Sequence, residues 1–434
     1  MSIRTILVLV SLGMLAVKVD AQTNYRLATP MPPTPGSVVM PTGNNVLAAP
    51  PLNPGVSVAT LPAGIYSLEP TTTTRTSRAN PIAPTTGQGE SAPSSPRDRI
   101  WIAFDYFYGG SQGVWTPPLL TSSPPGTPVF RAGALDQSTT TILTGNQRVN
   151  NNFVPGFRKG GGYWFDDDRT SGIDASVTML GQANSSAVVQ TLAGGNFLAR
   201  PVVNGTTLTQ SAYLFGGLTT GGATTSVDTS FITADINYRQ NLFADCETRL
   251  DGQIGYRFAQ VGDAVSIWNT GFATGAVPGV AGNVLSNDYF STRNNFNGVQ
   301  VGFALSREFG KKFSIEGYGK LAAGVTTSKA TVDGSSSTPD GTIYGTGVLA
   351  GITNRTNTTS NYFGVIPEVG LKVEYRVWKE LRLTAGYSFL YWNQVRRAPE
   401  QIDMTVLAPY HPGFRNVTTD YWVQGFTGGF QWRY

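Results

Sequence analysis

Large apolar residues alternate with polar or small residues along most of the chain after about residue 98. In one such segment Leu383, Tyr387 and Phe389 occupy odd positions, whereas Arg382 and Thr384 occupy even ones. Side chains two positions apart share a face of a β-strand, so the alternation predicts strands with one apolar and one polar face. About ten strands are predicted, at 99–108, 156–165, 170–190, 225–240, 248–268, 288–309, 313–333, 360–377, 381–395 and 419–434.

The connections between these strands alternate in length. Short links fall at about 166–169, 241–247, 310–312 and 378–380, and long stretches rich in Gly, Thr, Asn and Ser at about 109–155, 191–224, 269–287, 335–359 and 396–418. Short turns at one end and long loops at the other are typical of an outer-membrane barrel, whereas a soluble sandwich mixes connection lengths at both ends. We therefore predict an all-β fold, a transmembrane antiparallel up-and-down β-barrel over residues 98–434. An additional hairpin within 109–155 or 191–224 would give twelve strands.

Two further regions precede the predicted barrel. Residues 1–21 combine a charged start, a short apolar run and a small-residue cleavage site, which is typical of a secretory signal peptide. Residues 22–97 hold 14 of the 27 prolines, among Thr, Ser, Ala and Gly, and such a stretch cannot bury enough apolar surface to order itself. We predict a disordered linker there. An even number of strands puts both ends of the barrel on the short-turn, periplasmic side, so the linker is expected in the periplasm.

The last strand carries a second localisation signal. It resembles the sorting signal on the closing strand of bacterial outer-membrane barrels, whose polar, glycine and two aromatic positions match Thr427, Gly429, Trp432 and Tyr434. The resemblance implies a barrel in the bacterial outer membrane. It also implies two partners, the outer-membrane lipid and the barrel-assembly machinery, which would recognise this strand.

Composition narrows the chemistry further. Only 13% of the residues are charged and the net charge is +4 without a basic cluster, so nothing supports nucleic-acid binding. No later segment runs 18 apolar residues, which excludes a helical membrane protein. Cys246 is the single cysteine and His411 the single histidine. We therefore expect no internal disulfide, no histidine-cluster metal site and no cofactor.

Charged residues collect on the polar faces of the predicted strands, which would line the barrel lumen. The main candidates are Arg239, Arg249, Asp251, Arg257, Glu316, Lys320, Glu368, Lys372, Glu374, Arg376 and Arg382. With Arg158, Arg433, Asp105, Asp174, Asp235 and Glu308 the set has nine positive and eight negative members. Such a balance predicts pairing across neighbouring strands, and a barrel of this size leaves a thin path at best. Aromatic residues near strand ends, including Trp164 and Trp392, are expected in the interfacial girdles.

Three functions fit these observations. The first is a porin or narrow channel for small solutes, with a charge-balanced lumen and long extracellular loops. The second is a non-conducting structural or surface-binding barrel, similar to an adhesin. The third, a barrel hydrolase, needs a base beside a nucleophile or an activated water. Because His411 lies in the last long loop with no specific neighbour, we expect no enzymatic activity.

Several segments resemble the family of putative β-barrel porin-7 proteins of bacterial outer membranes. They cover roughly residues 99 to 260 and include Trp101–Tyr106, Pro117–Pro128, Arg148–Asn150, Gly162–Arg169, Gly172–Ser176, Leu198–Pro201, Asn237–Leu242 and Gly255–Arg257. The resemblance implies an outer-membrane barrel, and it brings no catalytic residues to this chain.

Overall fold

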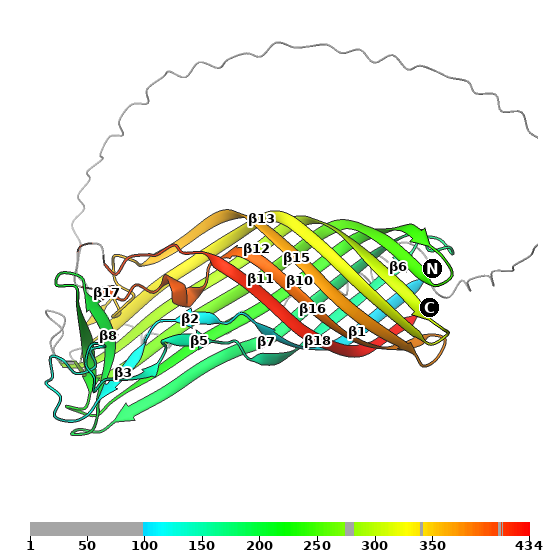
Figure 1. The fold of residues 1–434 in the computed structure, drawn as a ribbon. Coiled ribbons are helices and arrows are strands. Elements are labelled where there is room, and N and C mark those ends of the chain that lie inside the picture. The colour runs from blue at the N-terminus through cyan, green and yellow to red at the C-terminus, as the bar shows by residue number, and fades with distance from the viewer. Residues whose placement is uncertain (1–98, 274–281, 339–341, 407–408, 410) are drawn as a thin grey trace, which may run out of the picture. The chain divides into compact units, whose positions relative to one another are not determined.

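Ten long strands form one closed antiparallel barrel in the computed structural model, which describes residues 99–273, 282–338, 342–406, 409 and 411–434 (Figure 1). The predicted signal peptide and linker lie outside these residues and stay predictions. The barrel strands are β1 (Ile100–Ser111), β6 (Phe153–Trp164), β7 (Ser171–Thr191), β10 (Gly221–Ala244), β11 (Thr248–Ala273), β12 (Gly282–Phe309), β13 (Phe313–Ser337), β15 (Thr356–Arg376), β16 (Leu381–Val395) and β18 (Thr419–Arg433).

Each barrel strand pairs with the next one along the chain, and β18 pairs with β1 to close the ring. Phe104 lies opposite Phe430 at this closure. The predicted barrel of about ten strands is therefore confirmed, and the twelve-strand alternative is wrong. A hairpin does form within 191–224, from β8 (Phe197–Asn204) and β9 (Thr209–Gly216), but it pairs outside the barrel.

An apolar belt surrounds the half of the barrel nearest the short turns. On β12 the outward side chains Val299, Val301, Phe303 and Leu305 are exposed, whereas Asn295 and the outward positions beyond it are mostly polar. A strand that crosses a bilayer needs about 9–11 residues, and β12 has 28. The strands therefore continue well past the belt, toward the long loops. No helix in the described ranges has the length and apolar character to cross a membrane.

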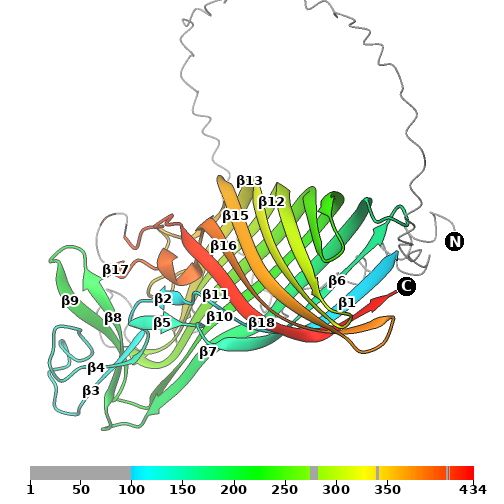
Figure 2. The same ribbon diagram turned by 45° about the vertical axis from the view of Figure 1, so that its right-hand side comes forward.

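The long connections fold into a cap at the end of the barrel opposite the C-terminus (Figures 1 and 2). Its larger sheet contains β17 (Thr405–Val406), β8, β3 (Leu120–Ser123) and β4 (Thr141–Thr144), with β9 beside β8. Four shorter elements accompany it: β2 (Val114–Thr116) pairs with β5 (Gln147–Val149), β14 (Ile343–Tyr344) extends β13, and η2 (Ala398–Gln401) is a 3-10 helix. The described parts of the long loops thus contain sheet structure of their own.

The cap is tied to the barrel wall by a buried charge. Arg200 of β8 forms an ion pair with Asp288 of β12, and both side chains are inaccessible to solvent. The second carboxylate oxygen of Asp288 accepts hydrogen bonds from the backbone N–H groups of Leu349, at 3.0 Å, and Ala350, at 2.6 Å. One carboxylate therefore fixes both β8 and the loop between β14 and β15 to the wall.

Candidate functional site

Ion pairs line the barrel interior near the short turns. All eleven main lumen candidates lie on the inward face of their strands, and each of them pairs with another inward charge. Glu374 is the most connected: it accepts from Lys372 at 2.8 Å, Arg382 at 3.0 Å and Arg433 at 3.1 Å. Because every carboxylate among these eleven residues has a cation within reach, this layer presents no ring of one sign.

The deepest pairs lie halfway along the strands. Glu368 of β15 binds the guanidinium of Arg257, from β11, and lies 3.6 Å from that of Arg158, from β6. Its other oxygen accepts a hydrogen bond from the Tyr318 hydroxyl at 3.1 Å. Lys320 binds Asp235 at 2.5 Å. These pairs join strands that are not neighbours, so they bridge the lumen as well as lining it.

Two cavities lie within this charged layer. One, of about 320 Å³, is at the short-turn end and is lined by Trp164, Arg249, Glu374 and other charged residues. The other, of about 120 Å³, is lined by Asp105, Arg158 and Lys320 among others. Cavities of this size hold several water molecules each. Neither is lined by any member of the aromatic layer that follows.

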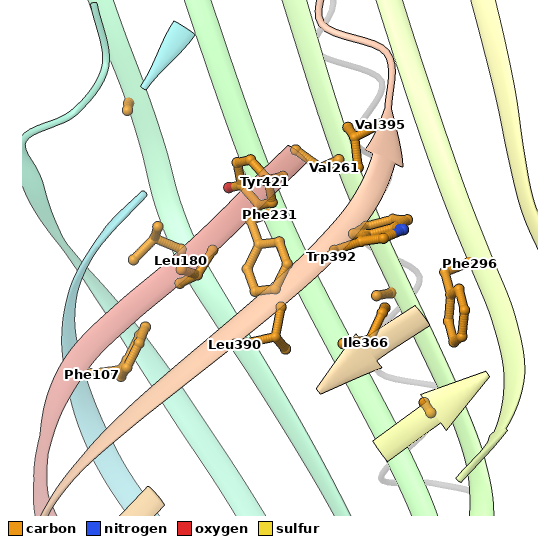
Figure 3. Packing of buried hydrophobic residues seen from close by; sticks show 14 of the residues in the cluster. Phe107, Leu180, Phe231, Val261, Phe296, Ile366, Leu390, Trp392, Val395 and Tyr421 are labelled. Atoms are coloured by element: carbon orange, nitrogen blue, oxygen red, sulfur yellow. The ribbon is translucent and has the colours of Figure 1, made fainter. Parts of the chain in front are cut away.

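An aromatic layer crosses the lumen above the charges. Phe107, Phe231, Phe296, Trp392 and Tyr421 come from five different strands and are at most 3% exposed. Figure 3 shows Phe231, Trp392 and Tyr421 gathered between the strands. The Phe231 and Tyr421 rings are 5.7 Å apart, those of Phe296 and Trp392 are 6.0 Å apart, and the indole N–H donates to the Thr326 hydroxyl. The layer is a packed apolar core inside the barrel.

Sequence reasoning missed this layer. Trp392 and Trp164 were expected in the outer girdles, but both side chains point inward and are buried, so the prediction is wrong for these two residues. Trp392 is an even number of positions from Arg382 and Thr384 on β16, so it lies on the same inward face. This spacing is the signal that could have placed it inside. Trp164 instead stacks on the guanidinium of Arg249, whose central carbon lies 4.4 Å from the ring centroid.

The chain that follows β16 turns into the barrel above the aromatic layer. Arg396, Arg397 and Ala398 are fully buried. The Arg397 guanidinium binds Asp263 of β11 through two nitrogens, at 2.5 and 3.2 Å. The Asn294 side chain forms two hydrogen bonds with the Arg396 backbone. Its amide N–H donates to the Arg396 carbonyl oxygen at 2.8 Å, and its oxygen accepts from the Arg396 N–H at 2.9 Å. The region 396–418 was expected to lie outside as a loop, and its first part is inside.

His411 has one notable partner. Its Nδ1 lies 2.7 Å from a carboxylate oxygen of Asp403. Burial alone would raise the pKa of Asp403, but hydrogen bonds from the backbone N–H groups of Gly413 and Thr405, together with the contact to His411, lower it. These contacts close a loop of the cap. The described residues contain no cluster of three or more His, Cys, Asp and Glu side chains arranged to hold a metal.

The closing strand places its four signal residues on two faces. Trp432 and Tyr434 point outward, whereas Thr427 and Gly429 point inward. A Cβ on Gly429 would lie 2.0 Å from the Phe104 carbonyl oxygen on β1. Any larger residue at this position would therefore clash with β1 at the point where the barrel closes.

A closed antiparallel barrel with an outward apolar belt and an inward polar face is the architecture of bacterial outer-membrane proteins. The chain belongs to the family described as putative beta barrel porin-7, whose model matches residues 101–434. The resemblance predicted from the sequence is thereby confirmed. The protein is a bacterial outer-membrane β-barrel.

The solved structures named here are only distantly similar. No curated protein matches. Among solved structures, the outer-membrane protease OmpT of Escherichia coli is 10% identical, with 78% of this chain and 98% of that chain covered and a TM-score of 0.40. The toluene transporter TbuX of Ralstonia pickettii is 9% identical, with 79% and 92% covered and a TM-score of 0.18. A FadL homologue of Pseudomonas aeruginosa is 8% identical, with 78% and 91% covered and a TM-score of 0.21.

One lysine stands on the outer face within the apolar belt. Lys159 of β6 is exposed between Phe104 and Val177 on the neighbouring strands, and its ammonium lies 5.9 Å from the Phe104 ring centroid. A lysine facing lipid costs up to about 2–4 kcal/mol near the bilayer midplane, and a cation–π contact offsets only part of this cost.

We expect Lys159→Leu to raise the free energy of unfolding in lipid vesicles by about 2 kcal/mol, because it removes this charge from the lipid. Urea titration followed by tryptophan fluorescence measures the change. The control is Lys312→Leu in the turn before β13, which should have little effect. A lower stability for Lys159→Leu would show that the ammonium is paired in the membrane.

Proposed function

We propose that this protein is a non-conducting outer-membrane barrel whose cap serves as a surface-binding platform. In this proposal the short turns and the N-terminal segment face the periplasm, and the cap faces the cell exterior. The closing strand, with Trp432 and Tyr434 on its lipid face, is proposed to recruit the barrel-assembly machinery.

The aromatic layer is the observation that carries the proposal. Hydrated ions lose their water at an apolar constriction, and such constrictions close channels by dewetting. Here the constriction is filled by side chains from five strands, including Phe231 and Trp392. Below it the cations are paired with carboxylates, and above it the segment with Arg397 occupies the lumen. Three successive barriers support a closed interior.

A narrow channel is the second candidate. The two cavities in the charged layer favour it, since they open a polar path from the short-turn end toward Lys320. Passage through the whole barrel would need both the aromatic layer and the inserted segment to move. This candidate therefore predicts conductance only in a rearranged state.

Planar-bilayer recording distinguishes the two candidates. We expect the refolded wild-type barrel to give no conductance steps above background in concentrated potassium chloride, because the aromatic layer admits no hydrated ion. The matched control replaces 396–406 with a short glycine-serine link and changes Phe231 and Trp392 to alanine, and it should conduct. Wild-type steps that shift on Lys372→Glu would refute the closed barrel.

A further inference from the structure

Two cations lie directly opposite each other on the outer wall of the barrel. Arg293 of β12 and Lys329 of β13 are partners in the strand register, and both side chains are exposed and point outward. Like charges directly opposite on neighbouring strands destabilise a sheet. Neither residue forms an ion pair with any group in the part of the chain that the structure describes. This opposed pair, the Arg293–Lys329 rung, therefore carries two positive charges that no described carboxylate neutralises.

The surrounding wall offers no carboxylate to neutralise this rung. Gly262 lies beside Arg293 on β11, and Thr359 lies beside Lys329 on β15. The nearest acidic groups of the outer wall are engaged elsewhere. Asp228 accepts hydrogen bonds from the amides of Gln182 and Asn184. Asp333 is bound to Arg355 at 2.8 Å.

The rung lies just beyond the apolar belt. Going outward along β12 and β13, the paired positions are Asn297 with Val325, Asn295 with Thr327, and Arg293 with Lys329. Two rungs of a strand tilted by about 45° rise roughly 10 Å above the edge of the belt. The polar headgroup region of a bilayer extends roughly 5–8 Å beyond the hydrocarbon core on each side, so the backbone of this rung lies at the outer edge of that region. Arg and Lys side chains are long and flexible, so the two cations can reach the lipid phosphates from there.

The order of side chains along the wall matches a phosphorylated lipid. Val299 and Phe363 are among the most exposed apolar residues of the belt and offer contacts to acyl chains. Asn295 and Thr327 follow with amide and hydroxyl groups, and the two cations come last. An Arg guanidinium binds phosphate through a planar fork and a Lys ammonium acts as a point charge, so together they suit one phosphate group.

We propose that Arg293 and Lys329 bind the phosphate of a lipid in the outer leaflet of the membrane. The proposal rests on the proposed function in one respect, namely that the cap end of the barrel faces the exterior. Binding would neutralise the repulsion between the two cations and would hold the barrel at a fixed depth. A free phosphate ion lacks the acyl chains that Val299 and Phe363 would contact, so the ligand is the intact lipid.

Lipid binding to the full-length barrel in detergent tests the proposal, with bisphosphorylated lipid A as the probe and native mass spectrometry as the readout. We expect the double variant Arg293→Gln, Lys329→Gln to bind about thirtyfold more weakly than wild type, since each cation near an anionic lipid contributes roughly a factor of five. The control Arg307→Gln, Lys312→Gln removes the same charges at the short-turn end and should bind like wild type.

Three outcomes would overturn the proposal: equal binding by the double variant, equal binding of dephosphorylated lipid A, or displacement of the lipid by an equal concentration of inorganic phosphate. The last outcome would identify a simple anion site. The test is independent of conductance, so a failure here leaves the closed barrel standing, and a conducting barrel leaves the lipid site standing.

Discussion

Replacement of Arg397 by methionine should release the segment that follows β16 and expose it to trypsin. The change leaves the Asp263 carboxylate, which is inaccessible to solvent, without its only ion-pair partner among the described residues. An unpaired buried charge of this kind costs about 3–5 kcal/mol. The barrel can avoid most of this cost if the segment moves out and lets water reach Asp263. Limited proteolysis with mass spectrometry should therefore detect a new cleavage after Arg396, which is buried in the intact protein.

Two further variants separate charge from packing. Arg415→Met removes another cation of the same loop, one that forms no ion pair within the described residues and donates a long hydrogen bond of 3.5 Å to the Ile402 carbonyl, and should stay as resistant at Arg396 as wild type. Adding Asp263→Asn to Arg397→Met removes the orphaned charge and should restore most of the protection, because the two residues act as one pair. If Arg397→Met resists trypsin like wild type, the pair with Asp263 is not what holds the segment.

The barrel was predictable from the sequence because lipid and lumen impose opposite demands on alternate residues. On β16 the predicted bounds and the observed strand Leu381–Val395 coincide. The same alternation put Glu368 and Arg257 on the polar faces of their strands. Their mutual contact was not predictable, because they are 111 residues apart and belong to strands that are not neighbours. Which charges meet depends on how the closed ring brings opposite walls together.

The cap and the inserted segment were beyond sequence reasoning for a different reason. Residues 396–418 show no alternation, and Arg396 and Arg397 look like solvated loop cations. Their burial depends on groups distant in the sequence: Asp263 is 134 residues from Arg397, and Asn294 is 102 residues from Arg396. Irregular backbone has no periodicity that would indicate which of its residues are buried. The aromatic layer did leave a trace, since Phe231 and Trp392 occupy the inward phase of their strands.

Glu368→Gln should be the most destabilising single change in the charged layer, with an expected loss of about 3 kcal/mol in the free energy of unfolding. Glutamine has nearly the same size as glutamate, so the loss of stability measures the effect of removing the charge. It leaves Arg257, which is 2% exposed, without its carboxylate, and it also removes the nearby anion from Arg158. Taking away one partner of a buried pair typically costs about 3–5 kcal/mol. Urea titration of the barrel in lipid vesicles measures the change.

The matched control is Glu308→Gln, near the short-turn end. Glu308 is half exposed and its partner Arg376 is 3.9 Å away, and exposed pairs contribute about 0–1 kcal/mol. Salt sharpens the comparison, because counterions screen exposed charges far more than buried ones. The loss in Glu368→Gln should persist in concentrated salt, whereas any loss in Glu308→Gln should vanish. Equal and salt-sensitive losses in the two variants would mean that water and ions reach Glu368, and with it that the charged layer is an open, hydrated path.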